Sequence, residues 1–254
     1  MTTANPWLPF GAHPESGIRL LCLPHAGAGA TAYRTWGQGL PEQIKACPVQ
    51  PPGRERRRRE EPFTRVDSLT RALAKEIAGS VRGPYALFGH STGALCAFET
   101  AREMRRIGAA PPVHLFVSGR RAPQLPMPRH DVGAMTVPEL AQALRRLGGT
   151  PEEVLSNPEL LALLQPVLAA DFSVNETYAH VAEDPLDLPV TAFAGIDDTG
   201  ADVALMEPWE SQTSREFVLH SFPGGHFAVF EHAARVHSLI SDALAPQLQT
   251  AGRN

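Results

Sequence analysis

Short apolar runs alternate with segments of helical pattern along most of this chain, and no other feature constrains the fold as strongly. Strands that alternate with helices indicate parallel βαβ units with right-handed crossovers. A last amphipathic helix is expected at about residues 228–244. We therefore predict an α/β fold, with a mostly parallel central sheet flanked by helices. The expected strands span residues 18–23, 46–50, 85–88, 113–117, 188–194 and 217–222.

Length and composition fit one large domain, residues 1–254, of this class. Apolar residues make up 43% of the chain, charged residues make up 20%, and the net charge is −4 at pH 7. This charge gives no overall basic footprint for nucleic acid, and no apolar stretch is long enough to span a bilayer. The three cysteines form no CxxC pair, which argues against a structural zinc site. Residues 1–17 lack a signal-peptide pattern, so we expect a cytoplasmic protein.

The stretch between residues 118 and 188 breaks the alternation, because it contains no convincing strand. Apolar residues at helical spacing predict one helix over 137–147 and a second over 160–168. We interpret approximately residues 123–180 as a helical lid insertion over a site at the strand ends, and extra core packing is the alternative. Three capping-box signatures predict helix starts here: Thr136 with Glu139, Thr150 with Glu153, and Ser156 with Glu159.

Residues 89–93 (Gly-His-Ser-Thr-Gly) match the pattern G-x-S-x-G. The motif follows an apolar strand and opens a helix expected at about 92–107, the context in which this motif presents a nucleophilic serine. Glycine at both ends removes side chains that would clash in so tight a turn. The helix N-terminus also favours negative charge at this point. Ser91 is therefore the candidate nucleophile, and an ordinary glycine-rich turn is the alternative.

A serine hydroxyl is a poor nucleophile at neutral pH and needs a base. His226 follows the last expected strand in a Gly-Gly loop, and it is the only histidine placed there, downstream of Ser91 and before the final helix. In the chain order Ser…Asp…His, the acid should follow the strand at 188–194. Asp197 and Asp198 both lie there, and position alone does not choose between them.

An oxyanion hole needs two N–H donors aimed at one point. The first candidate is the backbone N–H of Thr92, which follows the nucleophile. The second should come from the small-residue turn after the first strong strand, where we expect the Ala26 N–H to serve. A plain tight turn is the alternative interpretation of that segment.

Eight segments spread over nearly the whole chain carry a family resemblance: 23–27, 52–55, 89–93, 118–123, 147–155, 170–172, 176–178 and 222–227. Together they resemble the discrete type II thioesterases that accompany polyketide and nonribosomal peptide synthases, within the α/β-hydrolase fold. In that family the acid lies three residues after the glycine that ends the penultimate strand. The resemblance therefore implies Asp198, counted from Gly195, with Asp197 as the fallback. One departure is Thr92, where the family more often has methionine.

The resemblance implies hydrolysis of acyl thioesters held on the phosphopantetheine arm of a carrier protein, which clears misprimed or stalled acyl groups. Ser91 would form an acyl-enzyme with His226 as the base, while the N–H groups of Ala26 and Thr92 stabilise the oxyanion. No metal or bound cofactor is implied, because the phosphopantetheine arm belongs to the substrate. The implied partner is an acyl or peptidyl carrier protein of a synthase, without nucleic acid or membrane, and we expect a monomer.

Other functions and several further residues stay open at this point. The alternatives are an esterase on free acyl esters, a chain-releasing thioesterase domain cut from a synthase, and a synthase-binding partner without turnover. Basic residues at Arg54 and 56–59 form either a solvated loop or a docking surface for an acidic carrier protein. A second candidate docking group consists of Arg120, Arg121 and Arg129. Asp171 and Phe172 are expected to border the entrance, and Cys96 and His90 to be structural.

Overall fold

The computed structural model describes residues 5–11 and 17–251. Within them, six strands form one sheet in the order β2-β1-β3-β4-β5-β6, and every pair of neighbours is parallel. The predicted parallel α/β architecture is confirmed, and each strand lies within two residues of an expected start or end. The strands are β1 (Ile18–Leu23), β2 (Ile44–Pro48), β3 (Tyr85–His90), β4 (Leu115–Ser118), β5 (Val190–Gly195) and β6 (Phe217–Phe222).

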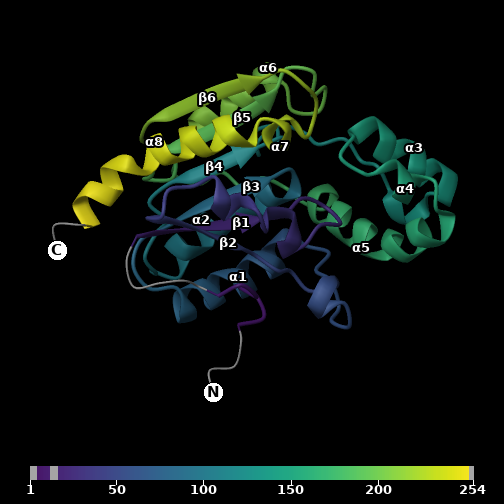
Figure 1. Cartoon of the computed structure of the whole chain (residues 1–254), viewed down its shortest axis with the longest axis horizontal. Helices are drawn as coiled ribbons and strands as arrows, with labels where there is room; N and C mark the ends of the chain where they lie inside the picture. Colours follow the sequence, from purple (N-terminus) through teal and green to yellow (C-terminus); the bar gives the residue numbers. More distant parts are fainter. Residues whose placement is uncertain (1–4, 12–16, 252–254) are drawn as a thin grey trace.

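Helices cover both faces of the sheet, which explains why β1, β3, β4 and β5 are buried along their whole length. Alternate residues of one strand serve opposite faces: Leu21 and Leu87 pack in one cluster, while Leu20 and Phe88 pack in another. The first cluster includes residues of α1 and α2, and the second includes residues of α8, which Figure 1 shows lying across the sheet. The helices are α1 (Val66–Ser80), α2 (Thr92–Arg106), α3 (Val137–Leu147), α4 (Glu152–Leu155), α5 (Pro158–Glu176), α6 (Val203–Met206), α7 (Ala228–Glu231) and α8 (Ala233–Ala251). The 3₁₀ helices are η1 (Ala30–Tyr33), η2 (Trp36–Gln38), η3 (Glu55–Arg57), η4 (Val132–Ala134) and η5 (Glu207–Gln212).

The order of the strands reverses beside β1. The chain runs outward from β1 to β2 and then returns to β3 on the other side of β1. The loops that follow β1 and β3 therefore leave the sheet in different directions and open a crevice at the carboxyl ends of these strands. Both the expected nucleophile turn after β3 and the small-residue turn after β1 lie at this point.

The connection from β4 to β5 carries α3, α4 and α5, which we call the helical segment (residues 123–180). Figure 1 shows these helices grouped together at the right, on the side toward which β6 points. They have an apolar cluster of their own, separate from the two on the faces of the sheet. Among the described residues, no helix is both long and apolar enough to cross a membrane.

One of the three predicted helix starts in this segment is confirmed, and two are wrong by one residue. Thr136 and Glu139 form the capping box of α3. The N-cap of α4 is Pro151, and that of α5 is Asn157, whose side chain accepts a hydrogen bond from the Leu160 N–H. Pro158 is the first residue of α5, and a residue before proline is held in an extended conformation, so it becomes the cap. The expected C-terminal helix is likewise divided into α7 and α8.

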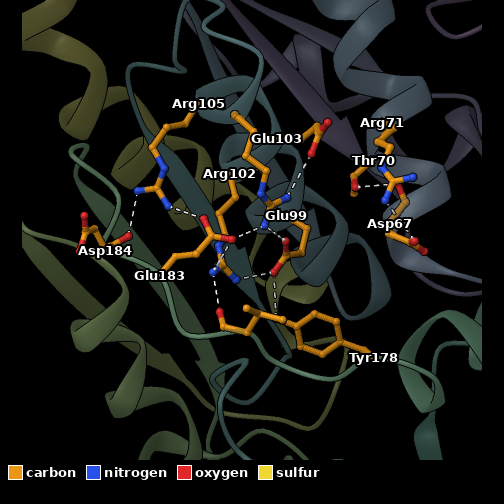
Figure 2. A network of polar contacts seen from close by, with 12 residues as sticks. Asp67, Thr70, Arg71, Glu99, Arg102, Glu103, Arg105, Tyr178, Glu183 and Asp184 are labelled. Carbon is orange, nitrogen blue, oxygen red and sulfur yellow. Dashed lines mark hydrogen bonds and ion pairs between the residues drawn. The ribbon is translucent and has the colours of Figure 1, made fainter.

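A charged network ties the chain that leaves α5 to the end of α2 (Figure 2). The Tyr178 hydroxyl donates to Glu99 at 2.9 Å, and the buried Arg102 donates to Glu99 at 2.8 Å. Arg102 also donates to the Val181 carbonyl at 2.5 Å and lies 3.0 Å from Glu183. The C-terminal end of the helical segment is therefore attached to the α/β body through buried polar contacts.

Candidate active site

Ser91 occupies a strained turn between β3 and α2, with φ of 55° and ψ of −120°. A residue other than glycine adopts such a positive φ rarely, and it does so mostly where the surroundings hold it. A Cβ atom at Gly89 would lie 2.1 Å from the Gly93 carbonyl oxygen, and one at Gly93 would lie 2.2 Å from the Leu23 carbonyl oxygen. The steric reason predicted for both glycines of the motif is confirmed.

The structure brings Ser91, His226 and Asp198 into one hydrogen-bonded row. His226 Nε2 lies 3.0 Å from Ser91 Oγ, and His226 Nδ1 lies 2.7 Å from Asp198 Oδ2. A carboxylate at Nδ1 holds the proton on that nitrogen, which leaves Nε2 free to accept the serine proton. Asp198 is buried, and its second oxygen accepts the Gly200 N–H at 3.0 Å. Asp197 is exposed, and from the described part of the chain its carboxylate accepts only the Gly224 N–H and makes no bond to the histidine.

Two further histidines pack beside His226 and stay neutral. Burial, and then the proximity of His226, lowers the pKa of His25 to about 4. Burial also lowers the pKa of His90 well below its ordinary value, and His226 and His25 add to the effect. His90 Nδ1 lies 3.1 Å from the Ser118 hydroxyl, which fits the structural role expected for it. At neutral pH neither ring adds a positive charge next to His226.

The two N–H groups expected to form the oxyanion hole belong to the loops after β1 and β3. Within the described residues, no hydrogen bond uses the N–H of Ala26 or of Thr92. The neighbouring Gly27 N–H is occupied, because it donates to Asp171 Oδ2 at 2.7 Å. Ala26, Thr92, Ser91 and His226 all line the same cavity, so both residues with an unused N–H border the space beside the serine.

That cavity has a volume of about 850 Å³ and lies between the strand ends and the helical segment. Its floor carries the polar groups described above. Its opposite wall is apolar and comes from α3, α4 and α5, with Leu140, Leu144, Val154, Leu164, Leu168 and Phe172. Such a chamber suits a hydrophobic chain that ends in a polar reacting group beside Ser91.

Two arginines of the candidate docking groups, Arg54 and Arg120, are buried, so neither alternative, a solvated position or a docking position, holds for them. Arg54 forms two bonds to the buried Asp171 carboxylate, at 2.5 and 2.9 Å. Arg120 donates to the Asn175 side chain at 2.5 Å. Neither guanidinium is accessible to a partner protein, because Arg54 is only 7% and Arg120 only 4% exposed. Asp171 is also not at the entrance as expected, whereas Phe172 does line the cavity.

The internal contacts of Asp171 and Asn175 were not predicted from the sequence. Both are polar residues on an otherwise apolar stretch of α5, one helical turn apart. A polar pair at this spacing on an apolar helix face is the signal that could have indicated a buried polar contact. Cys96 is buried as expected, and burial raises the pKa of its thiol to about 12, which leaves the sulfur unreactive.

No cluster in the described residues combines three or more histidine, cysteine or acidic side chains in a way that could hold a metal ion. The groups that the structure brings together beside the cavity are the row of Ser91, His226 and Asp198 and the loops that contain Ala26 and Thr92.

Comparison with known proteins gives one consistent family. The family model described as Thioesterase domain matches residues 18–244. Gramicidin S biosynthesis protein GrsT of Aneurinibacillus migulanus is 43% identical, and the match covers 91% of each chain.

Solved structures agree with this result. The RedJ thioesterase of the prodiginine pathway of Streptomyces coelicolor is 35% identical with a TM-score of 0.83, over 91% of this chain and 87% of RedJ. The type II thioesterase BorB of the borrelidin biosynthetic cluster is 35% identical with a TM-score of 0.86, over 96% of this chain and 100% of BorB. With a family model and relatives of this identity along nearly its whole length, the chain belongs to the thioesterase family.

Proposed function

We propose that this protein is a discrete type II thioesterase of polyketide or nonribosomal peptide biosynthesis. It would hydrolyse acyl groups from the phosphopantetheine arm of acyl or peptidyl carrier proteins, and so clear misprimed or stalled chains. The observation that carries the proposal is the row of Ser91, His226 and Asp198, with contacts of 3.0 and 2.7 Å, on the floor of the apolar cavity. The relatives GrsT, named as a gramicidin S biosynthesis protein, and BorB, named as a type II thioesterase of the borrelidin biosynthetic cluster, support the proposal.

Acylation would begin when His226 Nε2 takes the proton of Ser91 Oγ and the oxygen attacks the thioester carbonyl carbon. The carbonyl oxygen becomes an oxyanion, which the N–H groups of Ala26 and Thr92 stabilise. Asp198 stabilises the imidazolium that has formed. The C–S bond then breaks, the sulfur of the arm takes the proton from His226, and the acyl group stays on Ser91 as an ester.

Deacylation repeats these steps with water. His226 Nε2 takes a proton from a water molecule, whose oxygen attacks the ester carbonyl carbon. The same two N–H groups stabilise the second oxyanion, and the bond to Ser91 Oγ breaks as His226 returns the proton. The products are a free carboxylic acid and the original enzyme. Each step uses only residues of this chain, so the proposal requires no cofactor.

We propose that the helical segment acts as a lid that closes the acyl chamber. Its inner wall is apolar and faces the serine across the cavity of about 850 Å³. Burial of a hydrophobic chain against this wall would contribute roughly 25 cal/mol for each Å² removed from water. The expected monomeric state stays a prediction.

The test is hydrolysis of a panel of acyl groups, each presented on a phosphopantetheinylated carrier protein and on a small thiol mimic. Ser91→Ala runs beside the wild type. We expect a higher kcat/KM on the carrier, and loss of turnover in the variant. Equal or better turnover of free acyl esters would instead favour an esterase, and full pathway support by Ser91→Ala would favour a binding partner without turnover.

A further inference from the structure

One helix of the helical segment contacts both loops that hold the proposed oxyanion donors. Asp171 and Asn175 lie one turn apart on α5, and both are buried. Asp171 Oδ2 accepts the Gly27 N–H at 2.7 Å, and Asn175 Nδ2 donates to Thr92 Oγ1 at 2.7 Å. The first contact is to the loop after β1, and the second is to the turn after β3.

Each of these α5 residues is in turn held by a buried arginine of the α/β body. Arg54, after β2, binds the Asp171 carboxylate through both terminal nitrogens, at 2.5 and 2.9 Å, and also donates to the Ala28 carbonyl. Arg120, after β4, donates to Asn175 Oδ1 at 2.5 Å. Both side chains of α5 are therefore fixed from one side by a cation and from the other by a loop of the active site.

The part of α5 that contains Asp171 and Asn175 also packs against the α/β body. Val174, between them, is fully buried in the apolar cluster on the α2 face of the sheet. Asn175 Nδ2 also donates to the Asp171 carbonyl at 3.3 Å, which links the two residues within the helix. Immediately after α5, Tyr178 joins the network with Glu99 and Arg102 that Figure 2 shows. The C-terminal half of α5 therefore has a fixed position relative to the sheet.

We infer that Asp171 and Asn175 are positioning residues. Located in the C-terminal half of α5, which is packed against the body, they hold the backbone N–H groups of Ala26 and Thr92 in the positions that the oxyanion hole requires. The inference rests on the function proposed above. The Gly27 N–H belongs to the peptide that begins at Ala26, so its bond to Asp171 fixes the orientation of the residue whose own N–H is the donor. The bond to Thr92 Oγ1 fixes the side chain, and with it the Cα, of the second donor residue.

The decisive variant is Thr92→Val, which keeps the shape and the backbone N–H of Thr92 but removes the hydroxyl that Asn175 binds. We expect kcat on an acyl thioester to fall roughly 10-fold to 100-fold, with KM within about twofold, because a small displacement of a donor weakens only transition-state binding. Asp171→Asn should have the same effect through the other loop. The matched controls are Thr177→Val, at the exposed C-cap of α5, and Glu159→Gln, in its exposed first turn.

A second readout separates positioning from general stability. A trifluoromethyl ketone that adds to Ser91 places its oxygen in the oxyanion hole, whereas an acyl thioether of the same length fills only the chamber. We expect both site variants to lose affinity for the ketone by the same factor as kcat, and to bind the thioether as the wild type does.

Three results decide the matter. Wild-type kcat and ketone affinity in folded Thr92→Val would overturn the inference. Parallel losses of ketone and thioether affinity would overturn it too, because they indicate a structural role only. Full turnover by Ser91→Ala would instead refute the function on which the inference rests. If Asp171→Asn does not fold, because Arg54 loses its counter-charge, Thr92→Val still decides the outcome.

Discussion

The α/β body and the helical segment are held together by different kinds of contact. In the body, β1, β3, β4 and β5 are buried along their whole length, with one apolar cluster on each face of the sheet. The helical segment has one smaller cluster, and Leu163 on its outer side is 75% exposed. Val174 of α5 belongs to a cluster of the body, and Leu125 and Tyr178, near the two ends of the segment, pack against that cluster. The proposed reacting groups thus lie on the more extensively packed region, and the other region forms the wall against which the acyl chain would pack.

The largest expected effect concerns two adjacent aspartates of the body. Asp198→Asn should lower kcat roughly 10³-fold to 10⁴-fold, because an amide cannot hold His226 in the reactive tautomer or stabilise its charge. Asp197→Asn should stay within about twofold of the wild type, since among the described residues its carboxylate accepts only the Gly224 backbone N–H. Steady-state hydrolysis of one acyl thioester measures both. A larger loss for Asp197→Asn would reverse the assignment.

The next effect compares one leucine from each region. Leu87→Ala, in the sheet, should lower the free energy of unfolding by about 4–5 kcal/mol, since the rigid surroundings cannot close the cavity. Leu144→Ala, in the wall of the chamber, should cost about 2–3 kcal/mol and shift preference toward bulkier acyl groups. Urea unfolding and the acyl panel measure these changes. Equal destabilisation with unchanged chain preference would contradict the difference between the regions.

Acid should weaken the body in particular, because the histidines with lowered pKa values lie there. Burial lowers the pKa of His114 to about 4, and His25 shows a similar value. These histidines take up a proton near pH 6.5 in the unfolded chain but only near pH 4 in the folded chain. Their contribution to the free energy of unfolding is therefore complete above pH 6.5 and is lost as the pH falls toward 4. Urea unfolding at pH 7.5 and pH 5 should show the loss. His114→Gln should reduce this pH dependence, and an unchanged dependence would contradict the assignment.

The smallest expected effect concerns the exposed arginines of the basic run. Arg56, Arg58 and Arg59 are exposed, in contrast to the buried Arg54. If they attract an acidic carrier protein, replacing all three with glutamate should raise KM for the carrier substrate about 3-fold to 10-fold at low salt, and less at high salt. Turnover of a small thiol mimic should not change. An equal rise in KM for both substrates would exclude docking at this loop.

Much of the fold could be predicted because it depends on local patterns. The parallel strands follow from short apolar runs, and the capping box of α3 follows from Thr136 and Glu139. Helix α1 was not predicted, although Leu69, Leu73 and Ile77 recur at helical spacing on its buried face. The starts of α4 and α5 were misplaced, because each is set by a proline and not by the hydroxyl residue before it.

In the site, too, the features that depend on local patterns could be predicted, and those that depend on contacts distant in sequence could not. Ser91 and His226 could be placed from the turns that carry them, whereas the choice of Asp198 over Asp197 depended on the family resemblance. The contact of Arg54 with Asp171 joins residues that are 117 positions apart. No local pattern encodes such a pair, because it arises only when α5 packs on the loop after β2. Arg54 belongs to a run of basic residues that is typical of an exposed loop, so its burial could not be predicted from the sequence.

The most direct test of the central claim is to trap the acyl group on the enzyme. The wild type is mixed with an acyl carrier substrate, quenched in acid within one turnover, and digested for peptide mass analysis. We predict the mass of the acyl group on the peptide that contains Ser91, its disappearance as free acid forms, and neither event in Ser91→Ala. Hydrolysis without an acyl group on Ser91, or turnover by Ser91→Ala, would contradict the account.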